Sequence, residues 1–317
     1  MILAAVSAVA ASASAQTIAL SIFDAPGATA GSFTDASGVN DAGVIVGFED
    51  STGSPRGFVR ASNGKITSFT VPGAGFTVLG DINNNSQMTG QFGPANFSAR
   101  HGFYTSGANV IPFDVPGMAY TLSRGINDEG QIVGDSIDAN HVRRGFLRDA
   151  NGHFTSLDIP GATAVFAFGI NNKGQIVGEY RTGDPLNPVT HGYLRSPNGV
   201  FTSFDAPGFD ANGAVAFTSA NGINDLGMIT GGTNGAGYVR DANGGYRSFE
   251  TPDGYYNPTG FGINNLGLVV GAIDDDFTTH AFRATLVPEP GALALLMGMA
   301  GMGTLALRRK TGCGDKA

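Results

Sequence analysis

The sequence predicts an all-β protein, namely a six-bladed β-propeller of four-stranded blades. Three sequence markers carry this prediction, because each recurs six times at intervals of about 45 residues, the length of one blade. They are a turn of the Asn-[Asp/Asn]-x-Gly family, a proline step and a Gly-aromatic pair. No stretch of residues 17–286 shows a sustained helical period, so the whole repeat region is expected to be β-structure.

The positions of the three markers define the copies. The turns begin at Asn40, Asn83, Asn127, Asn171, Asn224 and Asn264. The second marker is a proline that follows an aromatic residue and, in most copies, an acid: Pro26, Pro72, Pro116, Pro160, Pro207 and Pro252. The third marker begins at Gly57, Gly102, Gly145, Gly192 and Gly237, with Ala281 in the sixth copy.

The fourth copy shows the repeating unit most clearly. Residues 164–170 predict a first strand, a turn at 171–174 follows, and 175–178 predict a second strand. A long loop at 179–190 leads to a third strand at 191–195, and a turn at 197–200 leads to a fourth at 201–206. The Asn-Gly pair in this last turn indicates a two-residue hairpin loop. That loop predicts Tyr193 opposite Phe204 and, in the first copy, Phe58 opposite Phe69.

The two ends of the repeat region predict how the ring closes. The sixth copy stops after its third strand at 280–283, whereas a spare fourth strand lies at 18–25. We expect this N-terminal strand to complete the last blade and to join the ends of the ring, which removes exposed sheet edges. The alternative is an open β-solenoid, which would need polar caps on its terminal repeats.

The N-terminus carries the pattern of a signal peptide. Residues 1–15 are apolar and end in Ala-Ser-Ala, a small-x-small sequence that suits signal peptidase. The segment departs from the usual pattern because it contains neither Lys nor Arg. The alternative is an ordinary buried strand or helix.

The C-terminal segment, residues 287–312, combines three parts. A Val-Pro-Glu-Pro sequence comes first, an uncharged run at 291–307 predicts one transmembrane helix, and a basic cluster that favours the cytoplasmic side follows. The motif residues are Pro288, Glu289, Pro290, Arg308 and Arg309. This arrangement resembles the PEP-CTERM sorting signal, also described as an ice-binding protein C-terminal domain. The alternative is a plain single-pass anchor.

The PEP-CTERM resemblance implies a location and partners. Proteins with this signal are exported by biofilm-forming, exopolysaccharide-producing Gram-negative bacteria. The transpeptidase exosortase is thought to cut them, and the helix would hold the chain in the membrane before that step. The resemblance therefore implies signal peptidase and exosortase as processing partners, a place at the cell surface or in the extracellular matrix, and exopolysaccharide as a neighbour.

The repeats resemble the extracellular HAF-repeat family. Residues 280–282 spell His-Ala-Phe, and His101 and His191 begin close variants of it. Residues 125–134 match the Gly-Ile-Asn-x-x-Gly core of that family. The resemblance covers nearly all of residues 17–286 and implies architecture and location, but the family brings no established chemistry.

Composition and motifs exclude several function classes. A net charge of −8 argues against binding to nucleic-acid phosphates, and a single Cys excludes a disulfide framework. No Gly-x-Ser-x-Gly, Walker A or His-Glu-x-x-His motif occurs. First strands offer mostly small or apolar residues to the axis, with Asp81 as the exception. The sequence thus predicts no catalytic residues and no resident cofactor.

Candidate binding residues lie in the loops that vary in length between copies, because variable loops on a rigid scaffold often bind ligands. The predicted binding face comprises Glu179, Tyr180, Asp184, Asp210, Tyr255 and Tyr256. The acidic run Asp274, Asp275 and Asp276 is a weak candidate for Ca²⁺, with a solvated loop as the alternative. The recurring histidines, His101, His191 and His280, are expected too far apart to share a metal ion.

These observations predict an exported, non-enzymatic propeller at the bacterial cell surface that binds glycan or extracellular matrix, or docks a partner. Exposed tyrosines could stack on sugar rings, although half-buried packing is the ordinary role of such residues. The alternative function is a metal-dependent propeller hydrolase or lactonase.

Overall fold

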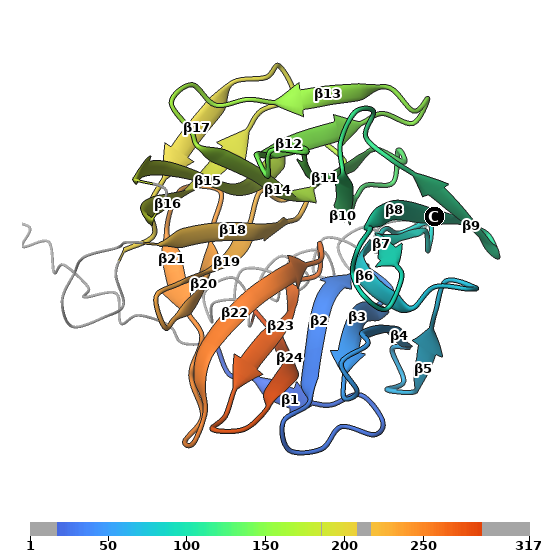
Figure 1. The fold of residues 1–317 in the computed structure, drawn as a ribbon. Coiled ribbons are helices and arrows are strands. Elements are labelled where there is room, and N and C mark those ends of the chain that lie inside the picture. The colour runs from blue at the N-terminus through green and yellow to red at the C-terminus, as the bar shows by residue number, and fades with distance from the viewer. Residues whose placement is uncertain (1–17, 185, 208–216, 287–317) are drawn as a thin grey trace, which may run out of the picture. The chain divides into compact units, whose positions relative to one another are not determined.

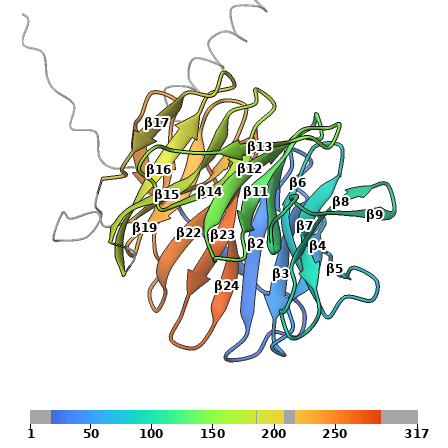
Figure 2. The ribbon, with the colours of Figure 1, turned by 45° about the horizontal axis from the view of Figure 1, so that its top comes forward.

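The structure, a computed structural model, describes residues 18–184, 186–207 and 217–286. These residues form 24 β-strands, and none of them is helical. Figure 1 shows the sheets arranged around a common centre, and Figure 2 shows the same strands tilted by 45°. This arrangement is that of a β-propeller, in which each sheet packs against its neighbours face to face.

Four sheets contain four strands each, in sequence order from the centre outward. The first comprises β6 (Phe76–Ile82), β7 (Met88–Gly93), β8 (His101–Ser106) and β9 (Asn109–Phe113). The second comprises β10 (Tyr120–Ile126), β11 (Ile132–Ile137), β12 (Arg143–Arg148) and β13 (Phe154–Leu157). The third comprises β14 (Ala164–Ile170), β15 (Ile176–Asp184), β16 (Asn187–Arg195) and β17 (Phe201–Phe204). The fourth comprises β18 (Thr218–Ile223), β19 (Ile229–Thr233), β20 (Gly237–Arg240) and β21 (Tyr246–Ser248).

The remaining strands form one eight-stranded sheet in the order β22-β23-β24-β2-β3-β4-β5, with β1 paired to β24. Its strands from the C-terminal repeat are β22 (Tyr256–Ile263), β23 (Leu268–Asp274) and β24 (Thr279–Thr285). Its N-terminal strands are β1 (Ser21–Phe23), β2 (Phe33–Val39), β3 (Ile45–Asp50), β4 (Arg56–Arg60) and β5 (Ile66–Phe69).

The prediction of six four-stranded blades plus a C-terminal helix is therefore wrong. Four blades have four strands, and the other eight strands are continuous because β2 and β24 pair in parallel at Phe33 and Thr279. The amide of Thr279 donates to the carbonyl of Ser32 at 3.2 Å, which extends this link. The described residues contain no helix, and the helix expected at 291–307 lies outside them.

The N-terminal strand pairs where the sequence predicts. β1 runs antiparallel to β24, with Ser21 opposite Arg283 and Phe23 opposite Ala281. Just before β1, Ile18 forms a parallel bridge with Phe249, which lies after β21. The two ends of the repeat region are thus joined by backbone hydrogen bonds, and the edge of β24 is covered.

The predicted hairpin register is wrong by one residue. Phe58 lies opposite Ser68 rather than Phe69, and Tyr193 lies opposite Ser203 rather than Phe204. The cause is the loop length: the amide of Ala61 donates to the carbonyl of Lys65 at 2.9 Å, so three residues form the loop. Gly64 ends that loop with φ 90°, the left-handed conformation of a three-residue hairpin.

The long loop expected at 179–190 is mostly strand. β15 and β16 continue as an antiparallel pair as far as Asp184 opposite Asn187. Beyond Tyr180, the β15 part of this extension consists of Arg, Thr, Gly and Asp, so the alternation of apolar and polar residues that marks a half-buried strand is lost.

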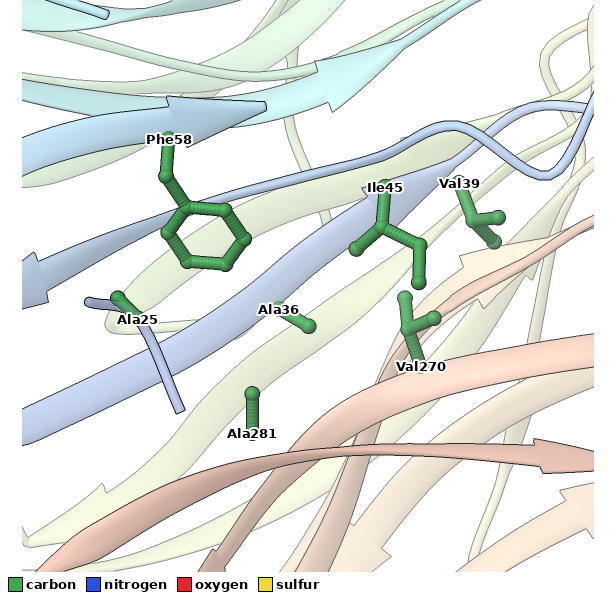
Figure 3. Close-up of a cluster of buried hydrophobic side chains, with 7 residues drawn as sticks. All are labelled: Ala25, Ala36, Val39, Ile45, Phe58, Val270 and Ala281. Atoms are coloured by element: carbon green, nitrogen blue, oxygen red, sulfur yellow. The ribbon is translucent and has the colours of Figure 1, made fainter. Parts of the chain in front are cut away.

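Apolar residues pack between neighbouring sheets rather than in one central core. Figure 3 shows a cluster inside the eight-stranded sheet, where its N-terminal and C-terminal strands meet and Phe58 and Ile45 pack with smaller side chains from segments far apart in sequence. Its other members are Ala25, Ala36, Val39, Val270 and Ala281. Because Ala25 and Ala281 come from opposite ends of the repeat region, this cluster also stabilises the closure of the ring.

One turn carries local strain that a substitution should relieve. The inner turns are the Asn-[Asp/Asn]-x-Gly turns that follow the innermost strands. Three of them end in Gly43, Gly130 and Gly174 with φ between 71° and 75°, but the second copy has Ser86 there with φ 60°. A non-glycine residue in this conformation costs about 1 kcal/mol. We expect Ser86→Gly to raise the free energy of unfolding by roughly that amount, measured by urea titration with an unchanged m value. A loss of stability would contradict this explanation.

Candidate functional site

The six innermost strands, β2, β6, β10, β14, β18 and β22, each contain a β-bulge near the C-terminal end. At the bulge the pairing with the next strand skips one residue, for example between Ser123 and Gly125 of β10. The skipped residues are Ser37, Gly80, Arg124, Phe168, Asn221 and Phe261. A bulged residue is freed from the alternation of the strand, and all six line the axis of the ring.

Glycine follows the bulge in five of these strands because a neighbouring backbone passes very close. A Cβ added to Gly222 would lie 2.5 Å from the carbonyl oxygen of Phe261, and one added to Gly125 would lie 2.7 Å from that of Phe168. The second copy reverses the order, with Gly80 at the bulge and Asp81 after it. Asp81 is therefore inserted between strands, and its carboxylate accepts the amides of Ile82 at 2.8 Å and Ile126 at 3.2 Å.

Two cavities lie along the axis and share the six bulge residues. The narrow cavity has a volume of about 90 Å³ and is surrounded by the Asn-[Asp/Asn]-x-Gly turns. The wide cavity has a volume of about 370 Å³ and is lined by the middle parts of the innermost strands and by residues of the second strands. We call the latter the axial cavity.

Two closed rings of hydrogen bonds hold the narrow end. Each buried turn asparagine donates its Nδ2 to the backbone carbonyl of the next, over distances of 2.8–3.3 Å, and Asn264 returns to Asn40. The residue after each asparagine donates its amide to the side chain of the next at 2.7–2.8 Å. The members of this second ring are Asp41, Asn84, Asp128, Asn172, Asp225 and Asn265. The side chains of these turns are thus hydrogen-bonded to the neighbouring turns, which indicates a structural role.

Asp135, Arg124 and Arg143 form an ion-pair triad next to the axial cavity. Asp135 on β11 has a fully buried side chain, and its two oxygens accept from Arg124 Nε at 3.1 Å and from Arg143 Nη1 at 2.9 Å. The guanidinium of Arg124 also lies 5.5 Å from the ring centre of Phe168. A carboxylate shared by two guanidiniums fixes their orientation, so Arg124 is held at the axis by its partner and by the aromatic face.

A second acid–base pair lines the cavity directly. Glu179 on β15 is buried, and its Oε1 accepts from Arg181 Nη2 at 3.3 Å. The guanidinium of Arg181 lies 4.8 Å from the ring centre of Phe166. Burial raises the pKa of Glu179, while hydrogen bonds from Ser219 and Arg181 act in the opposite direction.

Two further carboxyls titrate close to neutral pH. Burial raises the pKa of Asp35 to about 7, against the hydrogen bond from Ser37 and the charge of Arg124. Burial likewise raises the pKa of Asp81 to about 7, against the two backbone amides that it accepts. Near pH 7 both groups are therefore partly protonated.

Of the predicted binding residues that the structure describes, only Glu179 lines the axial cavity. Tyr180 points to the other face of β15, where its hydroxyl bonds Ser203 at 2.9 Å and its ring stacks on His191. Asp184 is exposed near the tip of the β15–β16 hairpin, and Asp210 lies outside the described residues. The structure thus separates Glu179 from its sequence neighbours.

The predicted tyrosine pair lies on a different sheet. Tyr255 packs edge-on against His280, and the exposed Tyr256 donates its hydroxyl to the carbonyl of Asp275 at 2.6 Å. The sheet β18–β21 stands between them and Glu179. The predicted residues therefore form no single site.

Two acids of the run at 274–276 form hydrogen bonds with neighbouring residues of the protein. The carboxylate of Asp275 accepts the amides of Phe277 and Thr278 and contacts His280 at 3.1 Å, and that of Asp274 accepts from Thr279. Among the residues that the structure describes, no three His, Cys, Asp or Glu side chains form a group that could hold a metal ion.

The recurring histidines pair with the acid of the proline step in the same repeat. His101 contacts Asp114 at 2.9 Å, His191 contacts Asp205 at 2.9 Å, and His280 contacts Asp24 at 2.8 Å. Burial lowers the pKa of His280, but its bonds to Asp275 and Asp24 raise it overall above the ordinary value. These pairs link the third and fourth strands and explain why both residues recur.

Arginines recur three residues after the start of the Gly-aromatic marker, at Arg60, Arg148, Arg195 and Arg240, and within the described residues none of them forms an ion pair. Their guanidiniums instead lie over aromatic rings: that of Arg60 is 4.8 Å from the ring of Phe23, and that of Arg240 is 4.9 Å from the ring of Phe204. The contact is a cation–π interaction that bridges neighbouring repeats.

Sequence reasoning identified Glu179 but missed two other polar residues of the axial cavity, Asp35 and Arg124, both on innermost strands. It also missed Asp135, which holds the guanidinium of Arg124. One signal could have found Arg124: the residue before the Gly-Ile-Asn core differs in every neighbouring copy, whereas the core around it is repeated. A position that escapes the repeat is a candidate for function.

The sorting-motif residues and the signal-peptide segment lie outside the described residues. Within the described part of the chain, no helix is long and apolar enough to cross a membrane.

Comparison with known proteins gives no family. No model of a known protein family matches the chain, and no curated protein matches its sequence. Three solved structures share its general form: a gluconolactonase from Xanthomonas campestris (TM-score 0.48, 9% identity, 80% of this chain and 88% of that chain), TolB from Acinetobacter baumannii (0.48, 8%, 76% and 63%) and a puromycin hydrolase (0.42, 12%, 78% and 46%). The chain spans less than two thirds of the last two. Likeness at this level carries no argument about function.

Fold and site together define a β-propeller with a polar cavity on its axis. The assignment follows from the strand order, from the sheets arranged around one centre and from the closed rings of turn hydrogen bonds.

Proposed function

We propose that this chain is an exported, non-enzymatic propeller that binds a saccharide of the extracellular matrix, and that the axial cavity is the binding site. The observation that carries the proposal is the cavity itself, about 370 Å³ in volume and lined by both planar polar and aromatic side chains. Cavities of roughly 300 Å³ and above hold small ligands.

The chemistry of the lining suits a sugar. Carboxyl, amide and guanidinium groups from Asp35, Gln91 and Arg124 can donate to and accept from hydroxyl groups. Phe168 and Phe261 are only partly buried and present apolar surface at the bulge positions. A pyranose carries both kinds of surface, since its hydroxyls lie around the ring edge and its C–H groups on the faces.

Export and processing belong to the same proposal. They are supported by the apolar segment 1–15, by the sorting motif and by the repeat signature. On this proposal, signal peptidase and exosortase act on the chain, and the mature protein meets exopolysaccharide at the cell surface.

The test is a glycan array probed with the 317-residue chain, followed by titration calorimetry on every glycan that binds. Phe261→Ala should weaken binding about tenfold or more, because it removes apolar surface from the cavity. Phe277→Ala is the matched control, since Phe277 is 77% exposed and lies outside the cavity, and it should bind like the parent chain. Tyr256→Ala should also be neutral.

Three outcomes would overturn the proposal. The first is the absence of any glycan ligand on the array. The second is binding that Tyr256→Ala abolishes and Phe261→Ala leaves intact, which would place the site on the loops. The third is release of shorter saccharides during incubation, which would show an enzyme.

A further inference from the structure

The guanidinium of Arg124 has an edge that the protein leaves available at the axis. Within the described residues, its Nε is bonded to Asp135, and neither Nη group has a hydrogen-bond partner. The side chain is 33% exposed and lines both the narrow cavity and the axial cavity. The ion pair and the aromatic face hold this guanidinium in place, and its terminal N–H groups lie at the cavity. They form a preformed binding site for an anion, to which they can donate hydrogen bonds.

The charge around the cavity favours the same ligand. The lining contains the guanidiniums of Arg124 and Arg181 and the carboxyls of Asp35 and Glu179. Burial raises the pKa of Asp35 to about 7, so this carboxyl is partly neutral near pH 7, and Glu179 is bonded to Arg181. With Asp35 protonated, the lining carries two guanidiniums and one carboxylate, although the whole chain has a net charge of −8.

We infer that the axial cavity selects a saccharide unit that carries a carboxylate, such as a hexuronic acid, and that Arg124 binds this carboxylate. The inference rests on the proposed function and names the chemical class of its ligand. A single negative charge matches the terminal N–H groups of Arg124, and a protonated carboxyl of Asp35 can donate to the ligand. A phosphorylated sugar fits less well, because its second charge would lie close to Asp35 and Glu179.

The test compares the affinities of D-glucuronate, D-glucose and D-glucose 6-phosphate for the 317-residue chain by titration calorimetry. We expect glucuronate to bind at least tenfold more tightly than glucose and more tightly than the phosphate, because a charge-assisted bidentate pair is stronger than neutral hydrogen bonds. Arg124→Gln should reduce the affinity for glucuronate at least tenfold and the affinity for glucose by a much smaller factor, so that the two sugars bind about equally. Arg124→Lys should retain part of the preference.

The control is Arg56→Gln, because Arg56 is exposed on β4 and lies outside the cavity lining. It removes the same charge from the chain and should leave the preference for glucuronate intact.

The outcomes separate the two proposals. Equal affinity for glucuronate and glucose, with loss of both in Phe261→Ala, would overturn the inference and leave the proposed function standing. Preference for the phosphate would also overturn it. No measurable binding of any sugar, on the array or in solution, would overturn both. Loss of preference in Arg56→Gln would show that net charge alone explains it.

Discussion

Asp135→Asn is expected to lower the free energy of unfolding by about 3 kcal/mol, the lower end of the range for breaking a buried ion pair. The Asp135 carboxylate is fully buried and bonds two guanidiniums. An asparagine keeps one acceptor oxygen, but its amide group would face an N–H of Arg124 or Arg143. The lower end applies because these arginines are 33% and 29% exposed and can recover some hydration.

Asp158→Asn is the matched control for this prediction. Asp158 lies near Arg144 at 3.9 Å in the same repeat, but its side chain is 66% exposed. Exposed pairs contribute about 0–1 kcal/mol, so this variant should unfold nearly like the parent chain. Urea titrations with equal m values are the measurement. Equal losses of unfolding free energy in the two variants would show that the buried triad stabilises the fold no more than an exposed ion pair does.

The stability of the protein should fall as the pH rises from about 4 to 7, owing to Asp35 and Asp81. In the folded protein burial raises their pKa from the ordinary 3.8 to about 7. Between these values the unfolded chain has released protons that the folded chain retains, so unfolding releases them and becomes easier as the pH increases. Each group contributes at most roughly 4 kcal/mol over the window, because one unit of pKa corresponds to about 1.4 kcal/mol.

Asp35→Asn tests this pH dependence with little change of shape, since the amide oxygen can still accept from Ser37. Below pH 4 the variant and the parent chain should have similar stability. At pH 8 the variant should be more stable by roughly 2–4 kcal/mol, because it has no charge to bury. Urea midpoints across pH 4–8 provide the measurement, and parallel curves for the two proteins would contradict the assignment.

Much of the fold could be predicted because its strands and turns are encoded locally and repeated. The alternation of residues 164–170 and the turn at Asn171 correspond to β14 and to the turn that follows it. The pairing of residues 21–23 with β24 followed from counting strands per copy. Local sequence, however, did not distinguish a two-residue from a three-residue hairpin loop, and the register of Phe58 was shifted as a result.

The features that were not predicted arise from contacts between copies. The parallel link of Phe33 and Thr279 joins two repeats into one sheet, and no local pattern marks it. The direction of Arg124 depends on a bulge, which breaks the alternation used to assign faces. Its partner Asp135 is on the next strand, in a position where other copies have Phe48 or Gln91. Such a pair becomes visible only when the strands are placed side by side.

The most direct test of the central claim, that the axial cavity is the binding site, is a crystal structure of the 317-residue chain grown with glucuronate. We expect electron density for the sugar in the axial cavity between Phe168 and Phe261, with the ligand carboxylate within hydrogen-bond distance of Arg124 Nη1 or Nη2. Density beside Tyr255 and Tyr256 with an empty axial cavity would contradict it.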